Sequence, residues 1–265
     1  MLRAKNEEEF LRVAATSIVD AVDEIVLVDN QSSDRTADIA AELAREFPGK
    51  VVCFSYPHSV SRVGAETRAL LRDSGAQAVG LSAIFYNWCL ARCGNPYVLK
   101  WDADMVATDE LSREIEAWRS SGDHFLCFRG ANIHPDRAHL AASKITDPVL
   151  LQQKLPLQDV PEWATALSYD SLEPRLFPRQ GAEFRSDSGW TQRLWSPQLD
   201  WTPEGVPLTR AAQTACFLHL KLCKRNPFSN YSEDLAELIA TNVAVGPRIN
   251  AEYRALLSVH GLVGP

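Results

Sequence analysis

The feature that most constrains the fold is the alternation of short apolar runs with helical patterns over the first half of the chain. Four runs have the apolar, β-branched composition of buried strands: 24–29, 51–55, 97–101 and 124–129. Segments of helical periodicity accompany them at 35–47, 64–73, 79–93 and 109–119. Strands that alternate with helices of this length are typical of a parallel sheet covered by helices. We therefore predict an α/β fold with a mostly parallel sheet flanked by helices.

A further helix is predicted at the start of the chain. Asn6 is followed by Glu7-Glu8-Glu9, and acidic residues after a capping residue suit the first turn of a helix. Apolar residues then follow at helical spacing: Phe10, Leu11, Ala14 and Ile18. We expect this helix to begin at Asn6. Asp34 is expected to cap the helix at 35–47.

Composition excludes several classes of protein. A chain of 265 residues suits one large α/β domain, or a domain with an appendage. Its net charge of −7 disfavours nucleic acid or an anionic membrane as the main partner. The sequence has neither a run that approaches a membrane-spanning helix nor the apolar core of a signal peptide at its start. Because its six cysteines are scattered without a Cys-x-x-Cys pair, we expect a reduced, cytoplasmic chain without a structural zinc site.

The pattern changes after about residue 130. Residues 134–210 are rich in Pro and Trp, with short strands indicated at 176–177 and 193–195. A long irregular stretch in a compact enzyme more often forms a substrate site than a linker. Helices are indicated again near 233–241 and 250–258. We therefore divide the chain into 1–130 and 131–265, with the substrate-binding irregular part in the second half.

Two carboxylates follow the predicted strand at 97–101. Asp102 and Asp104 are spaced Asp-x-Asp, where the chain leaves the sheet, so both side chains can face the cleft above it. Two hard oxygen ligands suit Mg²⁺ or Mn²⁺ holding a substrate diphosphate, because such an ion keeps sites for water and phosphate. The alternative is a pair of solvated aspartates in a turn.

Three segments resemble the nucleotide-sugar half of GT-A glycosyltransferases, above all family 2. They are Lys5-Asn6-Glu7-Glu8, the stretch from Val22 to Thr36, and Leu99-Lys100-Trp101-Asp102-Ala103-Asp104, and they cover roughly residues 3–106. The resemblance implies a GT-A, Rossmann-like fold. Residues 1–130 would then be the nucleotide-sugar-binding subdomain, and residues 131–265 the acceptor-binding portion and tail of the same domain.

The resemblance also implies roles for single residues. Asp29 would accept hydrogen bonds from the nucleotide base, Asp102 would lie near the ribose or a metal-bound water, and Asp104 would bind the metal. The opening turn, with Ala4, Asn6 and Glu7, would lie beside the nucleotide. For Asp29 the alternative is a turn residue that shapes its loop, and for the glutamates it is the helix-dipole role.

Two departures from the family pattern stand out. Only a few residues precede Asn6, which leaves little chain for a first strand. The helix before the Asp-x-Asp strand carries Tyr86-Asn87-Trp88, where many relatives have Arg-Asn. Arg62, Arg68 or Arg72 could replace the missing arginine, although a role as solvated helix charges explains them better.

The catalytic base is expected from the second half. An inverting transfer needs a carboxylate that takes the proton of the acceptor. Asp187 and Glu183 are the leading candidates, followed by Asp170 and Asp200. Relatives with a similar Arg-Leu-Phe strand often carry His-Glu a little later, but this chain has Thr191-Gln192. A surface-turn role is equally compatible with Asp187.

A basic segment near the end of the second half completes the predicted site. In 217–225 apolar residues alternate with polar ones, and a strand would place His219, Lys221 and Cys223 on one face. His219 would suit a third metal ligand, and histidine favours Mn²⁺ over Mg²⁺. Lys221 and Lys224, with Arg225, could neutralise the leaving diphosphate. The alternative is an isolated histidine beside a solvated basic edge.

The sequence thus predicts a metal-dependent glycosyltransferase that uses a nucleoside-diphosphate sugar and Mn²⁺ or Mg²⁺. The acceptor would be the hydroxyl of a carbohydrate or small molecule, with inversion at the anomeric carbon, as in polysaccharide or natural-product glycosylation. Two alternatives remain: a sugar-phosphate nucleotidyltransferase, disfavoured because residues 3–10 contain no glycine, and a non-catalytic nucleotide-sugar-binding relative. A dinucleotide-dependent oxidoreductase is disfavoured because no Gly-x-Gly-x-x-Gly follows an early strand.

Overall fold

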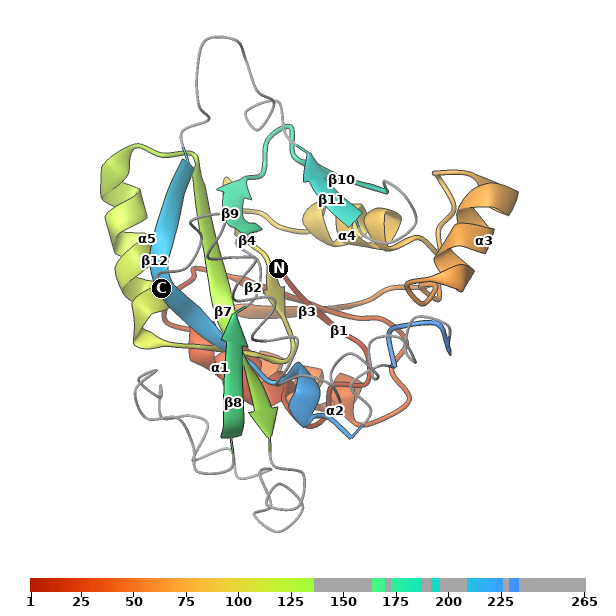
Figure 1. Cartoon of the computed structure of the whole chain (residues 1–265), viewed down its shortest axis with the longest axis horizontal. Coiled ribbons are helices and arrows are strands. Elements are labelled where there is room, and N and C mark those ends of the chain that lie inside the picture. Colours follow the sequence, from red (N-terminus) through yellow and green to blue (C-terminus); the bar gives the residue numbers. More distant parts are fainter. Residues whose placement is uncertain (136–163, 170–172, 187–191, 196–208, 226–228, 234–265) are drawn as a thin grey trace.

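A computed structural model describes most of the chain, including all of the first half. The described residues are 1–135, 164–169, 173–186, 192–195, 209–225 and 229–233. They form a parallel sheet, a larger mixed sheet and a two-stranded antiparallel ribbon (Figure 1).

The parallel sheet has the strand order β3-β2-β1-β5. Its strands are β1 (Leu2–Ala4), β2 (Ile25–Asp29), β3 (Val51–Ser55) and β5 (Trp101–Asp102). The connecting helices are α1 (Leu11–Ile18), α2 (Thr36–Glu46), α3 (Ala65–Ser74) and α4 (Ser82–Leu90). In Figure 1, α1 and α2 lie on one side of this sheet and α4 on the other. The predicted parallel α/β sheet with flanking helices is confirmed, and the first strand is present although it is short.

The helix predicted to begin at Asn6 is wrong at its start. Asn6 has a positive φ of 54°, and α1 begins only at Leu11, without an acidic residue in its first turn. The Oδ1 atom of Asn6 accepts a hydrogen bond from the Ser33 amide at 2.8 Å, and the Asn6 amide donates to Ser32 Oγ at 2.9 Å. These contacts hold the opening turn as a loop against the loop that follows β2.

The cap predicted for α2 is formed in a modified way. The residue in the cap position is Arg35, whose side chain makes no capping hydrogen bond. Asp34 instead accepts a hydrogen bond from the Thr36 amide at 2.9 Å. Burial would raise the pKa of Asp34, but its hydrogen bonds with Thr36 lower the pKa below its usual value. Asp34 therefore stabilises the start of this helix from one position further out.

The single strand predicted at 97–101 is divided between the two sheets. Strand β4 (Tyr97–Leu99) pairs antiparallel with β9 (Glu173–Pro178), whereas β5 pairs parallel with β1. The change occurs at Lys100, whose amide donates to the Arg175 carbonyl at 2.7 Å. The Asp-x-Asp turn therefore lies where the parallel and mixed sheets meet.

The mixed sheet has the order β4-β9-β7-β12-β6, and β8 pairs with β7. Its other strands are β6 (Met105–Ala107), β7 (Phe125–Pro135), β8 (Ala164–Tyr169) and β12 (Thr209–His219). Helix α5 (Asp109–Ser121) packs against β12 and β7, as Figure 1 shows at the outer side of the sheet. The sheet thus combines strands from both sequence halves.

The strand predicted across 217–225 ends early. Strand β12 stops at His219, and a short 3₁₀ helix, η1 (Lys221–Cys223), follows it. The Leu220 amide donates to the Asp104 carbonyl at 2.8 Å, which turns the chain toward the Asp-x-Asp turn. His219, Lys221 and Cys223 therefore do not share one face of a strand.

The ribbon of β10 (Glu183–Ser186) and β11 (Gln192–Trp195) contacts α4. Asn87 fixes this contact, since its side-chain amide exchanges hydrogen bonds of 2.8 and 2.7 Å with the backbone of Phe184. The tail helices predicted near 233–241 and 250–258 lie outside the described residues, except for Glu233.

One hydrophobic core joins the two sheets. At its centre the Trp101 and Phe217 rings lie 5.6 Å apart, and Phe128 packs beside both. The six cysteines are free and at least half buried. Among the helices of the described residues, none has the length and hydrophobicity to cross a bilayer.

Candidate active site

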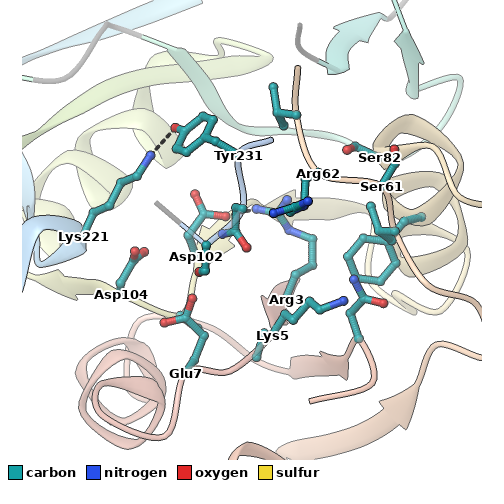
Figure 2. A pocket seen from close by; sticks show the side chains of 18 of the residues that line it. Arg3, Lys5, Glu7, Ser61, Arg62, Ser82, Asp102, Asp104, Lys221 and Tyr231 are labelled. Atoms are coloured by element: carbon teal, nitrogen blue, oxygen red, sulfur yellow. Dashed lines mark hydrogen bonds and ion pairs between the residues drawn. The ribbon is translucent and has the colours of Figure 1, made fainter. Parts of the chain in front are cut away.

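A pocket of about 560 Å³ opens at the carboxyl edge of the parallel sheet (Figure 2). The ends of β1 and β5 form one side of it, and the loop 59–66 with the start of α4 forms another. Residues from η1 and the segment 229–231 complete the lining. Chain segments far apart in sequence therefore meet here, as expected for a ligand site of an α/β protein.

Charged side chains of both signs line this pocket. The cations are Arg3, Lys5, Arg62, Lys221 and Lys224, and the acids are Glu7, Glu66, Asp102 and Asp104. Figure 2 shows Glu7, Asp102 and Asp104 around the same space as Arg3, Lys5 and Arg62. The Arg62 Nε atom donates to Glu66 at 2.8 Å, so this pair is internally satisfied. Such a lining suits a polar, negatively charged ligand rather than an apolar one.

The deepest acidic group is built around Asp104. The Lys224 ammonium lies 2.6 Å from Asp104 Oδ2 and 2.6 Å from Glu7 Oε1. His219 Nε2 lies 3.4 Å from the other Asp104 oxygen. The side chains of Glu7, Asp104 and Lys224 are all nearly buried. One ammonium therefore bridges two carboxylates from different parts of the chain.

This environment lowers the pKa of Asp104 and raises the pKa values of Glu7 and Lys224. Burial would raise the pKa of Asp104, but Lys224 and His219 hold it well below its usual range. Burial and the neighbouring Asp104 raise the pKa of Glu7 to about 7, against the opposing effect of Lys224. Burial would lower the pKa of Lys224, but the two carboxylates raise it above its ordinary value. The ammonium is therefore firmly charged in this environment.

Asp102 is held by a different set of cations. Arg3 donates a hydrogen bond to Asp102 Oδ1, and the Arg175 Nη1 atom lies 3.7 Å from Oδ2. The Arg3 guanidinium also lies over the Tyr86 ring, 3.6 Å from its centroid. Loss of solvation raises the pKa of Asp102 to about 6, although Arg175 opposes this. The two Asp-x-Asp carboxylates thus have separate cationic partners.

These donors do not fit a divalent ion as they are arranged. Among the described residues, no group of three or more His, Cys, Asp or Glu side chains could hold a metal. Asp102 binds arginines, while Asp104 and Glu7 bind an ammonium. The prediction that Asp102, Asp104 and His219 bind Mn²⁺ or Mg²⁺ therefore gains no support from this geometry.

The opening turn contributes to the pocket only in part. Ala4 and Glu7 line it, together with Lys5, whereas Asn6 is not among the lining residues. Asn6 is instead engaged with the loop after β2. Glu7 does not act in the first turn of a helix, because α1 begins four residues later. Its contact with Lys224 is the interaction that the helix-dipole interpretation missed.

Asp29 lies at the end of β2, as predicted. Both of its carboxylate oxygens lie 3.3 Å from the amide nitrogen of Ser32, which donates to them and shapes the loop. The next residue, Asn30, lines the pocket, whereas Asp29 itself does not. The recognition of a nucleotide base by Asp29 stays a prediction.

Of the predicted catalytic bases, Glu183 is the one that lies within the described residues. Glu183 is partly exposed on β10 and pairs with Arg185, and it is not among the lining residues. Asp187 lies outside the described residues, as do Asp170 and Asp200. The identity of the base therefore stays a prediction.

The predicted basic residues separate into two groups. Lys221 and Lys224 line the pocket, and Lys221 donates a hydrogen bond to the Tyr231 hydroxyl. Arg225 instead pairs with Glu8 and Glu9, both at 3.4 Å. Of the arginines considered as replacements, Arg62 lines the pocket, whereas Arg72 pairs with the adjacent Asp73 and Arg68 is not a lining residue.

Sequence reasoning missed Arg3 and Arg175. Both are buried, and together they flank Asp102. Arg3 lies between Leu2 and Ala4, and Arg175 directly precedes Leu176-Phe177, so the available signal is an arginine beside the apolar residues of a strand. A charge in a buried strand is costly unless it is paired, so it points to a nearby carboxylate.

The fold and the pocket place the protein among α/β proteins that bind ligands at the carboxyl ends of parallel strands. Residues 2–65 match the family model described as glycosyl transferase family 2. The resemblance to this family is therefore confirmed for the segment that forms β1, α1, β2, α2 and β3. No curated protein sequence matches the chain.

The solved structures similar to this chain include TarS of S. aureus. Residues 1–349 of TarS in complex with UDP-GlcNAc are 16% identical, with a TM-score of 0.37, covering 50% of this chain and 34% of that chain. A second structure of the same TarS residues is 13% identical, with a TM-score of 0.45, covering 83% of this chain and 59% of that chain. This chain thus spans less than two thirds of either TarS structure.

Proposed function

We propose that the protein is a glycosyltransferase that takes a nucleoside-diphosphate sugar as donor. This proposal rests on one observation: the segment that matches the family model also lines the pocket. Residues 2–65 match glycosyl transferase family 2, and the same residues supply Arg3, Lys5, Glu7 and Asn30 to the charged pocket. The family segment therefore forms part of the pocket wall.

The pocket suits the diphosphate of such a donor. Lys5 and Lys221 line it without a carboxylate partner among the ion pairs of the described residues, so both are suited to phosphate oxygens. The nucleoside would lie toward Asn30 and Asp29, at the end of β2. TarS binds UDP-GlcNAc in its solved complex, so we propose a UDP-sugar as the first donor to test.

In the proposed reaction the bond between the anomeric carbon and the diphosphate oxygen breaks, and its electron pair leaves with the diphosphate. The acceptor hydroxyl oxygen forms the new bond to that carbon, and its proton passes to a carboxylate. Pocket lysines stabilise the charge that develops on the leaving diphosphate. We propose inversion, a carbohydrate or small-molecule acceptor, and Asp187 or Glu183 as the base.

The test is a donor panel with purified protein. UDP-, GDP- and dTDP-sugars are incubated with the protein in buffer with EDTA and, separately, with Mn²⁺, and release of nucleoside diphosphate is measured. Arg3→Met, which removes a pocket cation, should abolish this release. The surface variant Arg72→Met should retain it, because Arg72 is exposed and its ion pair within the described residues is with the adjacent Asp73.

Two other outcomes would contradict the proposal. Formation of a nucleotide sugar from a sugar phosphate and a nucleoside triphosphate would identify a nucleotidyltransferase. Thermal stabilisation by a nucleotide sugar, with no turnover by any acceptor mixture, would identify a binding protein.

A further inference from the structure

The Lys224 ammonium lies where two carboxylates converge on the pocket. Its Nζ atom is 2.6 Å from both Glu7 Oε1 and Asp104 Oδ2, and its side chain is only 11% exposed. Such distances are those of short, charge-assisted hydrogen bonds. A lysine in this position is a fixed part of the site rather than a mobile surface cation.

The charges of the inner site are already balanced. Three carboxylates, Glu7, Asp102 and Asp104, face three cations, Arg3, Arg175 and Lys224. Glu173, which also neighbours Arg175, is balanced by Lys100 at 2.8 Å. A divalent ion would have to displace a buried ammonium from both of its carboxylates. The ion would also add positive charge to a site whose carboxylates are already matched by cations. Unbalanced charge in a poorly solvated site is energetically costly.

The ammonium retains the capacity to bind a ligand. A lysine ammonium carries three N–H donors. Glu7 and Asp104 account for two of them within the described part of the chain, and Lys224 lines the pocket. The third donor is therefore available for an anionic oxygen of a bound molecule.

We propose that Lys224 takes the position of a divalent cation beneath the donor diphosphate, so that the protein binds a nucleoside diphosphate without a metal ion. This inference rests on the proposed use of a nucleotide sugar. It assigns Asp104 and Glu7 to a different task from metal binding: they hold the ammonium in place. Asp102 binds Arg3 at the edge of the same pocket and neighbours the buried Arg175.

The first experiment uses Mn²⁺ alone and needs no nucleotide. Free Mn²⁺ is titrated against the wild-type protein and followed by electron paramagnetic resonance. We expect no binding at micromolar concentrations. Tight Mn²⁺ binding that is lost in Asp104→Asn would overturn the proposal, because the ion would then occupy the place assigned to Lys224.

Three variants sharpen this test. Lys224→Met frees two carboxylates beside His219 and should create a Mn²⁺ site that the wild type lacks. Lys221→Met removes a pocket lysine that does not contact Asp104, and should leave the absence of Mn²⁺ binding unchanged. Lys224→Arg keeps the charge and should also bind no Mn²⁺. Circular dichroism establishes that each variant is folded, and the wild-type titration needs no variant at all.

The second experiment measures binding of UDP and of inorganic pyrophosphate by calorimetry. In wild-type protein we expect the same affinity in EDTA as in Mn²⁺. Lys224→Met should weaken binding in EDTA by about tenfold or more, the effect of losing one hydrogen bond between charged groups. Binding by the wild type that requires Mn²⁺ would contradict the proposal. Absence of UDP and pyrophosphate binding under both conditions would refute the proposed function instead, and the Mn²⁺ titration would still decide the role of Lys224.

Discussion

At the residue scale, the carboxyl group of Glu7 makes the stability of the protein dependent on pH. Its pKa is raised by burial and by Asp104 from 4.5 to about 7, so the folded protein binds this proton more tightly than the unfolded chain. The resulting contribution to stability is fully present below about pH 4.5. It is lost as the pH rises through 7, so the free energy of unfolding falls with rising pH between these values.

Glu7→Gln should remove this part of the pH dependence. Urea unfolding of wild type and variant between pH 5 and 8 measures it as the difference between the two curves. We expect the stability of the variant relative to wild type to increase as the pH rises. Glu116→Gln, on an exposed part of α5, serves as the control and should run parallel to wild type. A Glu7→Gln curve that is also parallel would show that Glu7 titrates normally.

Arg175 provides a second prediction at this scale. Its buried guanidinium approaches Asp102 at 3.7 Å and Glu173 at 3.6 Å. Arg175→Met leaves both carboxylates without this cation, and we expect a loss of about 3 kcal/mol in the free energy of unfolding. Arg119→Met, which breaks a 3.8 Å surface pair with Glu116, should cost less than about 1 kcal/mol. Equal stability of the two variants in chemical denaturation would contradict this assignment.

The Asp-x-Asp pair shows what single residues reveal before a structure is known. Asp102 and Asp104 could be assigned to a pocket because they follow an apolar strand, and both line it. Their partners could not be assigned. Arg175 and Lys224 are far from them in sequence, and local patterns do not indicate which distant cation will neutralise a buried carboxylate. The metal at these carboxylates stays a prediction, while the structure places Arg175 and Lys224 beside them.

At the scale of elements, the contact between β7 and β12 depends on a glycine. Gly130 is the cross-strand partner of Phe217, whose ring packs against Trp101 and Phe128. A Cβ atom at residue 130 would lie 2.1 Å from this ring. The ring thus occupies the space above the glycine, as in cross-strand pairs where an aromatic residue covers a glycine.

Gly130→Ala should therefore destabilise the protein by about 1–3 kcal/mol, the typical cost of overpacking a core. Thermal and urea unfolding measure this loss. Gly94→Ala is a suitable control, since its added Cβ would meet only the Glu24 carboxylate at an ordinary 3.7 Å. If Gly130→Ala is as stable as Gly94→Ala, the Phe217 ring is not fixed over the glycine.

Elements could be predicted from local patterns, but their ends and partners could not. The periodicity of 35–47 and 51–55 matches α2 and β3 closely, because turn residues mark their ends: Asp34 precedes α2, and Pro48-Gly49 separates it from β3. The run 97–101 is apolar except for Lys100, and one lysine in a short strand does not indicate that it separates strands of two sheets. The alternation in 217–225 likewise cannot reveal that the Asp104 carbonyl ends β12 at His219.

At the scale of the whole molecule, the part of the fold that could be predicted is the parallel sheet, because its first strands are connected by short segments of chain. The strands β1, β2 and β3 follow one another through single helices, so their parallel pairing follows from the sequence pattern. The mixed sheet instead pairs β7 with β8, β9 and β12, which come from distant parts of the chain. Such pairings depend on packing across the whole molecule, which periodicity does not encode.

The same long-range organisation forms one wall of the pocket. Val63 and Tyr231 form a parallel bridge, and the Val63 amide donates to the Asn230 carbonyl at 2.9 Å. Ser232 is buried and fastens this contact, since its Oγ accepts from the Ala65 amide at 2.8 Å and donates to the Val63 carbonyl at 3.0 Å. The segment 229–232 is thereby held against the loop 59–66, and both line the pocket.

Ser232→Ala should loosen this wall without unfolding the sheets. Losing two hydrogen bonds costs about 1–3 kcal/mol, so the amides of Val63 and Ser232 should exchange with solvent deuterium at least about tenfold faster. The amides of β2 should keep their protection, because they pair only within the parallel sheet. Ser229→Ala, at an exposed residue of the same segment, is the matched control and should leave exchange at Val63 unchanged. Uniform loss of protection across both sheets would instead show that Ser232 supports the global fold, and unchanged exchange at Val63 would show that the bridge does not depend on this hydroxyl.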